Sequence, residues 1–291
     1  MRYGTFDDEN REYVIERPDV PVSWTNYLGV RDLCTVISHN AGGYTFHKSA
    51  ENNRLTRFRP NAIPLDRPGH YVYLRDDDTG DFWSISWQPV GKSLDEASYE
   101  VRHGLSYTRF SCDYTDIHAE QLLFIPVNDD VELWDVTVKN TGDTPRNLSV
   151  FNYLEWSFQH VEIDNQNLQM SLYASGTSYG DGIIEYDFFY EPWTYHFLAS
   201  SFEPDGYDCV RDTFLGAYRT ESDPAAVEQG QCSDSTELGG NHCGALHKRL
   251  HLAPGEEARL VFILGVGSRQ DAGRAAKARY SQLSHVDAAK A

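Results

Sequence analysis

The sequence has little positive charge, no long apolar run and few cysteines. Its 291 residues contain 25 Lys and Arg against 44 Asp and Glu, which gives a formal net charge of −19. A surface this acidic repels phosphate backbones and anionic lipid, so we expect neither nucleic acid nor a membrane as a partner. The N-terminus has no apolar segment of the kind found in signal peptides, and the longest apolar stretch, near residues 261–266, is too short to cross a bilayer.

The cysteines are an odd set without CxxC spacing, which is typical of free thiols in a reducing compartment. They are Cys34, Cys112, Cys209, Cys232 and Cys243. Together with the missing leader segment, they predict a cytoplasmic protein without a disulfide framework.

Aromatic residues are abundant, with 18 Tyr, 14 Phe and 6 Trp, and they favour strands over helices. Short segments of period-two alternation recur between clusters of Gly, Pro, Asn and Asp, as in an antiparallel all-β domain. Residues 131–138 alternate clearly, and alternation resumes over residues 148–158 after a turn-rich stretch. We expect these two segments to form one long hairpin, and residues 70–75 and 82–87 to form another.

The end of the chain differs from the rest. Residues 271–291 are rich in Ala, Lys and Arg and carry no strand signal, which predicts a helix or a helical linker. The helical pattern reaches Ala291 without a Gly or Pro stop signal. We therefore expect a chain cut from a longer protein, although a frayed natural tail gives the same ending.

Two clusters resemble metal sites but lack the required spacing. The acidic run at residues 76–81 has no closing bidentate Glu, so a solvated hairpin turn is the better prediction than a calcium loop. A second cluster lacks CxxC spacing, and two of its histidines would lie too far apart on a strand to chelate one ion. Its members are Cys232, His242, Cys243, His247 and His251. No Walker or dinucleotide motif occurs.

An amide-rich stretch, residues 159–169, follows the strand predicted at residues 148–158. Glu155, Glu162 and Asp164 flank it or lie within it, close to Trp156 and Phe158. Carboxylates, amides and aromatic rings together suit a polyhydroxylated ligand, because hydroxyls need donors and acceptors while sugar C–H faces stack on rings. A polar loop after a strand explains the same composition.

Several segments, in order along nearly the whole chain, resemble one known family. They include MRYGTFDDENREYVI at residues 1–15, WTNYLG at 24–29, ISHNAGGY at 37–44, RFRPN at 57–61, RHGLSY at 102–107 and RDTFLG at 211–216. These segments are similar to the N-terminal domain of the cellobiose and chitobiose phosphorylases, glycoside hydrolase family 94. Residues 66–76, 83–90 and 241–248 look most like the diacetylchitobiose phosphorylases.

The resemblance implies a mechanism. Such enzymes use inorganic phosphate to cleave a β-1,4-linked disaccharide reversibly, with inversion, to an α-sugar 1-phosphate and a monosaccharide. Phosphate attacks directly, so one carboxylic acid suffices, and no metal or organic cofactor is implied. The family places that acid on a helical barrel after the N-terminal domain. We therefore expect no catalytic residue in this chain.

The resemblance also implies a fold and a site. We predict an all-β fold, a large antiparallel β-sandwich (super-sandwich) over residues 1–268, followed by the start of an α-helical linker at residues 269–291. In family dimers this domain lends residues to the partner's active-site entrance, so we expect a homodimer. Gln166, Asp164 and Gln169 are the predicted substrate-binding residues, in the acceptor subsite of the partner subunit. The alternatives are a cellobiose phosphorylase of the same family and a stand-alone carbohydrate-binding or dimerisation sandwich without catalysis.

Overall fold

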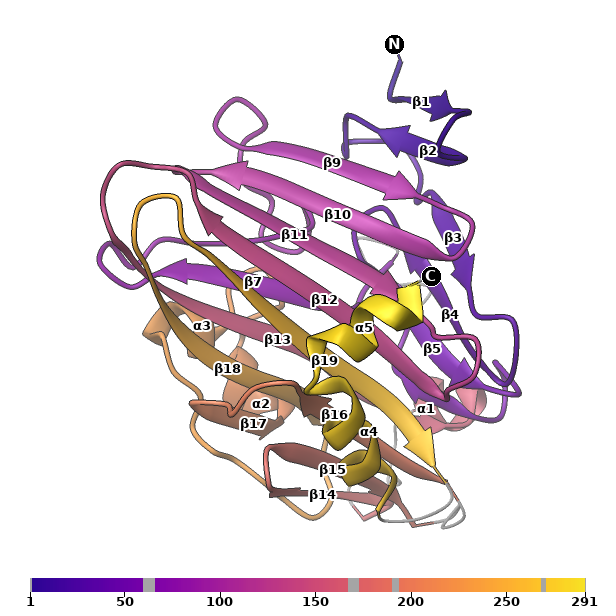
Figure 1. The fold of residues 1–291 in the computed structure, drawn as a ribbon. Helices are drawn as coiled ribbons and strands as arrows, with labels where there is room; N and C mark the ends of the chain where they lie inside the picture. Colours follow the sequence, from indigo (N-terminus) through magenta and orange to yellow (C-terminus); the bar gives the residue numbers. More distant parts are fainter. Residues whose placement is uncertain (1, 60–65, 167–172, 190–193, 268–270, 291) are drawn as a thin grey trace.

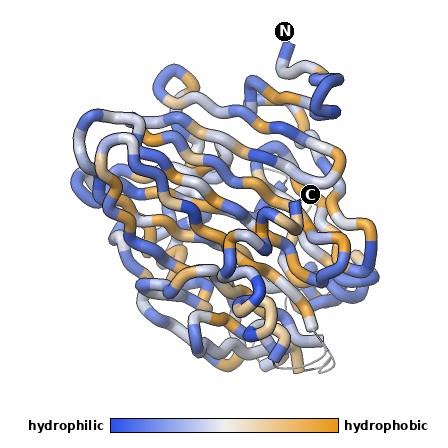
Figure 2. Tube along the Cα trace, in the orientation of Figure 1, coloured by the Kyte–Doolittle hydropathy of each residue, from blue (hydrophilic) through white to orange (hydrophobic). Residues whose placement is uncertain are grey.

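The computed structural model describes residues 2–59, 66–166, 173–189, 194–267 and 271–290. Strands in these ranges form two large antiparallel sheets that face each other, as Figure 1 shows. The predicted all-β sandwich is confirmed. The tube in Figure 2 changes repeatedly between hydrophilic and hydrophobic along the strands, in keeping with the alternation of the sequence.

The first sheet has ten strands in the order β1-β2-β9-β10-β11-β12-β19-β16-β15-β14. The strands are β1 (Gly4–Asp7), β2 (Glu12–Ile15), β9 (Ser98–His103), β10 (Tyr107–Tyr114), β11 (Ile117–Phe124), β12 (Val131–Asn140), β19 (Glu257–Gly267), β16 (Tyr195–Ser200), β15 (Ile183–Phe188) and β14 (Ser175–Gly180). Strand β19, which comes after the other described strands in the sequence, thus lies inside the sheet between β12 and β16.

The second sheet has nine strands, with β17-β18-β13-β6-β5-β4-β3 in line and β7 and β8 attached beside β13. Their bounds are β17 (Gly206–Val210), β18 (His242–Leu252), β13 (Arg146–Gln159), β6 (Arg54–Thr56), β5 (Gly43–His47), β4 (Leu33–Ser38), β3 (Thr25–Leu28), β7 (Tyr71–Asp76) and β8 (Phe82–Ser84).

The helices in the described ranges are short. They are α1 (Val161–Gln166), α2 (Arg211–Leu215), α3 (Ala225–Gln229), α4 (Ala272–Tyr280) and α5 (Leu283–Lys290). Helices α2 and α3 cover part of the nine-stranded sheet, whereas α4 and α5 lie across the ten-stranded sheet (Figure 1). Helices α4 and α5 confirm the helical structure predicted for residues 271–291. The prediction that this segment begins a linker stays a prediction. No helix in the described ranges is long and apolar enough to cross a membrane.

The core fills the space between the sheets with large rings. Trp156 of β13 stacks on Tyr186 of β15, with ring centroids 5.2 Å apart and planes 5° apart. Both side chains are almost fully buried, as are Trp83 and Trp134. Part of the aromatic richness of the sequence therefore lies inside the sandwich, where burial of rings stabilises the fold.

Strand β13 is buried on both faces. Leu154, Trp156 and Phe158 point into the sandwich, as their shared parity predicts, but Phe151 and Tyr153 on the opposite face are buried as well. Phe214 of α2 stacks on Tyr153 at 4.8 Å, so α2 covers this outer face. The positions that appeared solvent-facing in the sequence therefore form a second packing layer.

One predicted hairpin is wrong and the other is confirmed. The segments at residues 131–138 and 148–158 do not pair: β12 belongs to the ten-stranded sheet and β13 to the nine-stranded sheet. The turn-rich stretch between them carries the chain from one sheet to the other. By contrast, β7 and β8 pair antiparallel across the acidic turn.

Candidate substrate-contacting site

The candidate site begins where β13 ends. Gln159, the last residue of the strand, has φ of 63°, a left-handed backbone conformation that interrupts the extended chain. The backbone N–H of His160 then donates to the carbonyl of Phe158 at 2.7 Å, which closes a tight turn. Helix α1 follows at once, and its first N–H, on Val161, donates to the carbonyl of Glu51 at 2.9 Å.

Two of the predicted binding residues, Asp164 and Gln166, lie on different sides of α1. An α-helix turns by about 100° per residue, so Asp164 and Gln166 leave the helix about 200° apart. Asp164 faces the protein and is 3% exposed, whereas Gln166 is exposed at the end of the helix. Gln169 lies outside the described residues. The helix therefore presents Gln166 to solvent and keeps Asp164 inside.

The Asp164 carboxylate is occupied by protein donors. Its Oδ1 accepts from Arg57 Nε at 3.0 Å and from the backbone N–H of Phe158 at 3.2 Å. Arg57 is fully buried, and its guanidinium lies 5.0 Å from the centroid of the Phe158 ring. These contacts tie α1 to the segment after β6 and to the end of β13.

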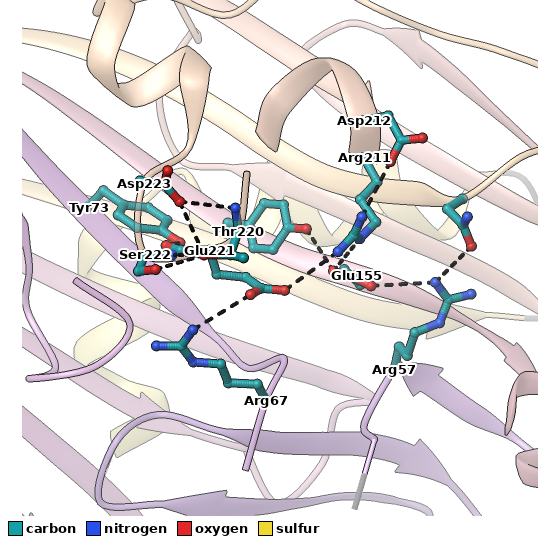
Figure 3. A network of polar contacts seen from close by, with 12 residues as sticks. Arg57, Arg67, Tyr73, Glu155, Arg211, Asp212, Thr220, Glu221, Ser222 and Asp223 are labelled. Atoms are coloured by element: carbon teal, nitrogen blue, oxygen red, sulfur yellow. Dashed lines mark hydrogen bonds and ion pairs between the residues drawn. The ribbon is translucent and has the colours of Figure 1, made fainter. Parts of the chain in front are cut away.

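Arg57 also belongs to a buried network of charges, which Figure 3 shows. At its centre is Glu155 of β13, whose Oε1 accepts from Arg211 Nε at 2.7 Å and from the Tyr153 hydroxyl at 2.9 Å. Arg57 Nη1 lies 3.4 Å from Glu155 Oε2 and donates to Asn241 Oδ1 at 3.1 Å. Four segments distant in the sequence thus meet around one carboxylate.

The network continues toward the surface through Glu221. Its carboxylate lies 3.8 Å from Arg211 Nη2 and 3.9 Å from Arg67 Nη1. The Glu221 carbonyl also accepts from the Tyr73 hydroxyl at 2.7 Å. Burial, together with the nearby charge of Glu155, raises the pKa of Glu221 above its ordinary value.

Glu155 does not have the properties of a general acid. Burial alone would raise its pKa, but the Arg211 and Arg57 guanidinium groups outweigh burial and lower the pKa below its ordinary value. An acid that protonates a leaving group needs the opposite shift. Glu155 is therefore a structural carboxylate, which binds side chains from several segments of the chain.

Sequence reasoning missed this network although its parts were in view. Arg57, Arg211 and Asn241 are the first residues of three segments that carry the family resemblance, at 57–61, 211–216 and 241–248. Each segment contains a polar residue beside apolar, strand-like ones, which is a signal for a buried polar contact. Which residues meet is a matter of tertiary structure.

The clusters set aside as metal sites have other roles. His247 stacks on Phe151 at 4.2 Å and its Nε2 lies 3.0 Å from Ser149 Oγ. The Asp76 carboxylate accepts from the backbone N–H groups of Asp78 and Thr79, and so caps the β7–β8 turn. Across the described residues, no group of three or more His, Cys, Asp or Glu side chains is arranged to hold a metal ion.

Comparison with known proteins decides the family. A family model described as "Glycosyl hydrolase 94, supersandwich domain" matches residues 11–283. The chain belongs to this family. The resemblance found in the sequence is thereby confirmed, and the matched residues include the strands of both sheets except β1.

Relatives of this supersandwich domain include two N,N'-diacetylchitobiose phosphorylases. The chain is 59% identical to that of Vibrio proteolyticus and 57% identical to that of Vibrio furnissii, each over 99% of this chain. It is 30% identical to a solabiose phosphorylase of Paenibacillus borealis over 94% of this chain. The chain spans 36% of the length of each of these three relatives.

Proposed function

We propose that this supersandwich domain is the N-terminal part of an inverting disaccharide phosphorylase. The enzyme reversibly cleaves a β-1,4-linked disaccharide, with diacetylchitobiose as the first candidate, to an α-sugar 1-phosphate and a monosaccharide. The observation that carries the proposal is the 59% identity to a diacetylchitobiose phosphorylase over 99% of the chain. The solabiose phosphorylase, at 30% identity, makes the disaccharides used by other enzymes of this family the second candidates.

In this proposal the domain supplies no catalytic group. Inorganic phosphate is the co-substrate, and no metal or organic cofactor takes part. The catalytic acid belongs to the portion of the enzyme that follows this domain. The lowered pKa of Glu155 and its three protein donors support this division, because they leave that carboxylate without a proton to give.

The domain acts on the substrate through α1. In the proposed homodimer, Gln166 reaches the acceptor subsite of the partner subunit, where its amide hydrogen-bonds a sugar hydroxyl. Gln169 is the second proposed contact. Asp164 was predicted with them, and we propose that it acts indirectly, through its contacts on the buried side of α1. A cytoplasmic location accompanies the proposal, and its support is that all five cysteines are unpaired.

The test uses an enzyme that carries this domain together with the following portion of its chain. Incubation with diacetylchitobiose and phosphate should release sugar 1-phosphate, whereas omission of phosphate should abolish release. Cellobiose under the same conditions distinguishes the second substrate. Phosphate-independent hydrolysis, or no reaction with any disaccharide, would contradict the proposal.

The role of Gln166 has its own test. In that enzyme, Gln166→Ala should raise the KM for the acceptor monosaccharide in the synthetic direction by about five- to tenfold, the loss of one hydrogen bond to substrate. Glu162→Gln, on the same helix and also exposed, is the matched control for a surface change. Unchanged acceptor kinetics in Gln166→Ala would leave the domain with a structural role alone.

A further inference from the structure

Helix α1 is too short to keep its shape alone. It has six residues, and isolated helices of that length are unstable in water because nucleation costs more than the few hydrogen bonds return. Its order must therefore come from contacts with the sandwich. Any residue that supplies those contacts controls where the exposed end of the helix is held.

Contacts of three described residues, Val161, Ile163 and Asp164, fix α1 to the sandwich. The first is the hydrogen bond from the Val161 N–H to the Glu51 carbonyl at the start of the helix. The second is the packing of Ile163 against the core. The third is the ion pair of Asp164 with Arg57, which lies closest along the helix to Gln166.

We infer that the buried Arg57–Asp164 ion pair is a positioning device that sets the orientation of Gln166. The inference rests on the proposed function for the task of Gln166, but the physical claim concerns this chain alone. Arg57 and Asp164 touch no reacting group; they act through the helix that carries Gln166.

Several contacts hold Arg57 in place, so that it can fix the position of Asp164. The backbone N–H of Arg57 donates to the carbonyl of Glu155 at 2.8 Å, and its side chain contacts the Glu155 carboxylate, as Figure 3 shows. The same side chain also donates to Asn241 and Asp164. A guanidinium bound at several points has one orientation, so it transmits that orientation to Asp164. Two residues further along, Gln166 leaves α1 on the opposite side, away from the sandwich.

Hydrogen exchange in this chain tests the physical claim. Asp164→Ala removes the anchor but leaves Arg57 paired with Glu155, so the sandwich should remain folded. Amides of residues 161–166 and of Phe158 should exchange about tenfold faster, because a charge-assisted hydrogen bond has been lost. Glu162→Gln, a neighbouring exposed position, should leave these rates unchanged. Unchanged exchange in Asp164→Ala would overturn the inference.

A folding failure is recognised from the rest of the sheet. Amides of residues 148–156 report whether β13 is intact, and they should stay protected in Asp164→Ala. Should this variant unfold, Asp164→Asn keeps an oxygen acceptor while losing the charge and serves in its place. Its exchange over residues 161–166 should then lie between that of the unmodified chain and full exposure; exchange equal to the unmodified chain would overturn the inference.

A double-mutant cycle in the longer enzyme tests the link to Gln166. If Asp164 acts through Gln166, Asp164→Ala should raise the acceptor KM by about five- to tenfold alone and have no further effect in a Gln166→Ala background. Additive effects would overturn the inference. An unchanged KM in Gln166→Ala would refute the proposed sugar contact instead, and the exchange experiment would still decide whether the ion pair positions α1.

Discussion

Trp156 and Tyr186 stack face to face across the sandwich, one from each sheet, with their ring planes only 5° apart. The indole Nε1 of Trp156 also donates to the carbonyl of Cys243 at 3.1 Å, so the ring is fixed at its edge as well as its face. This single side chain joins β15 of one sheet to β13 and β18 of the other.

Removal of the Trp156 ring should destabilise the whole domain. Trp156→Ala should lower the free energy of unfolding by about 3–5 kcal/mol, because it opens a large cavity between the sheets. Urea denaturation followed by circular dichroism measures this change. Tyr27→Ala removes an aromatic ring that is 72% exposed and should change the free energy by less than about 0.5 kcal/mol. Equal losses in the two variants would refute the interpretation.

Glu132 is a buried acceptor whose removal should also be costly. Its carboxylate is fully buried and accepts from Trp134 Nε1 at 2.5 Å, from Thr45 Oγ1 at 2.7 Å and from the Thr35 hydroxyl. Glu132→Ala removes the acceptor that these three donors share and leaves the Trp134 indole N–H without its partner, so it should lower the free energy of unfolding by about 3 kcal/mol or more. Glu132→Gln keeps one oxygen and should cost clearly less. The prediction fails if the two variants unfold at the same urea concentration.

His247 should make stability depend on pH. Burial lowers its pKa to about 4 from the ordinary value of 6.5, so between these pH values the unfolded chain binds more protons than the folded one. Stability should therefore rise with pH in that window, by up to about 1.4 kcal/mol per pH unit from this group. Urea titrations at pH 4.5–6.5 should give a smaller slope for His247→Gln. Above pH 7.5 the two proteins should show parallel curves, and an equally reduced slope there would contradict the assignment.

The chain alone should show no phosphorylase turnover. Purified residues 1–291, incubated with diacetylchitobiose and phosphate, should release no sugar 1-phosphate above a protein-free blank. The reason is that the proposed catalytic acid lies outside this domain. The full enzyme, assayed in parallel, is the positive control. Turnover by the isolated chain would move the catalytic residues into the sandwich.

The two predicted hairpins show what sequence patterns can and cannot specify. Both had alternating strands around a turn-rich stretch, yet only β7 and β8 pair. In that case Asp76 binds backbone N–H groups inside the turn, so the reversal is a local property. Alternation at residues 131–138 identified a strand but carries no information on which sheet it joins. That choice depends on pairing with β11 and β19, and β19 lies more than 100 residues away.

The candidate site, like the hairpins, was predicted from the sequence only in part. The amide-rich composition of residues 159–169 indicated a polar segment after a strand, and the exposed Gln166 fits that prediction. The burial of Asp164 was not predictable, because its partner Arg57 is 107 residues away in the sequence. A carboxylate in a polar segment looks solvent-facing until the tertiary contact that neutralises it is known.

The place of β19 inside the ten-stranded sheet has a consequence for synthesis. The other nine strands of this sheet, three on the β16 side and six on the β12 side, are made before the strand that joins them. A ribosome that has released residues 1–250 has therefore produced two half-sheets with bare edges at β12 and β16, each open to pairing with another chain. Premature termination before Glu257 should thus yield aggregates, and the newborn chain depends on β19 to join the two half-sheets.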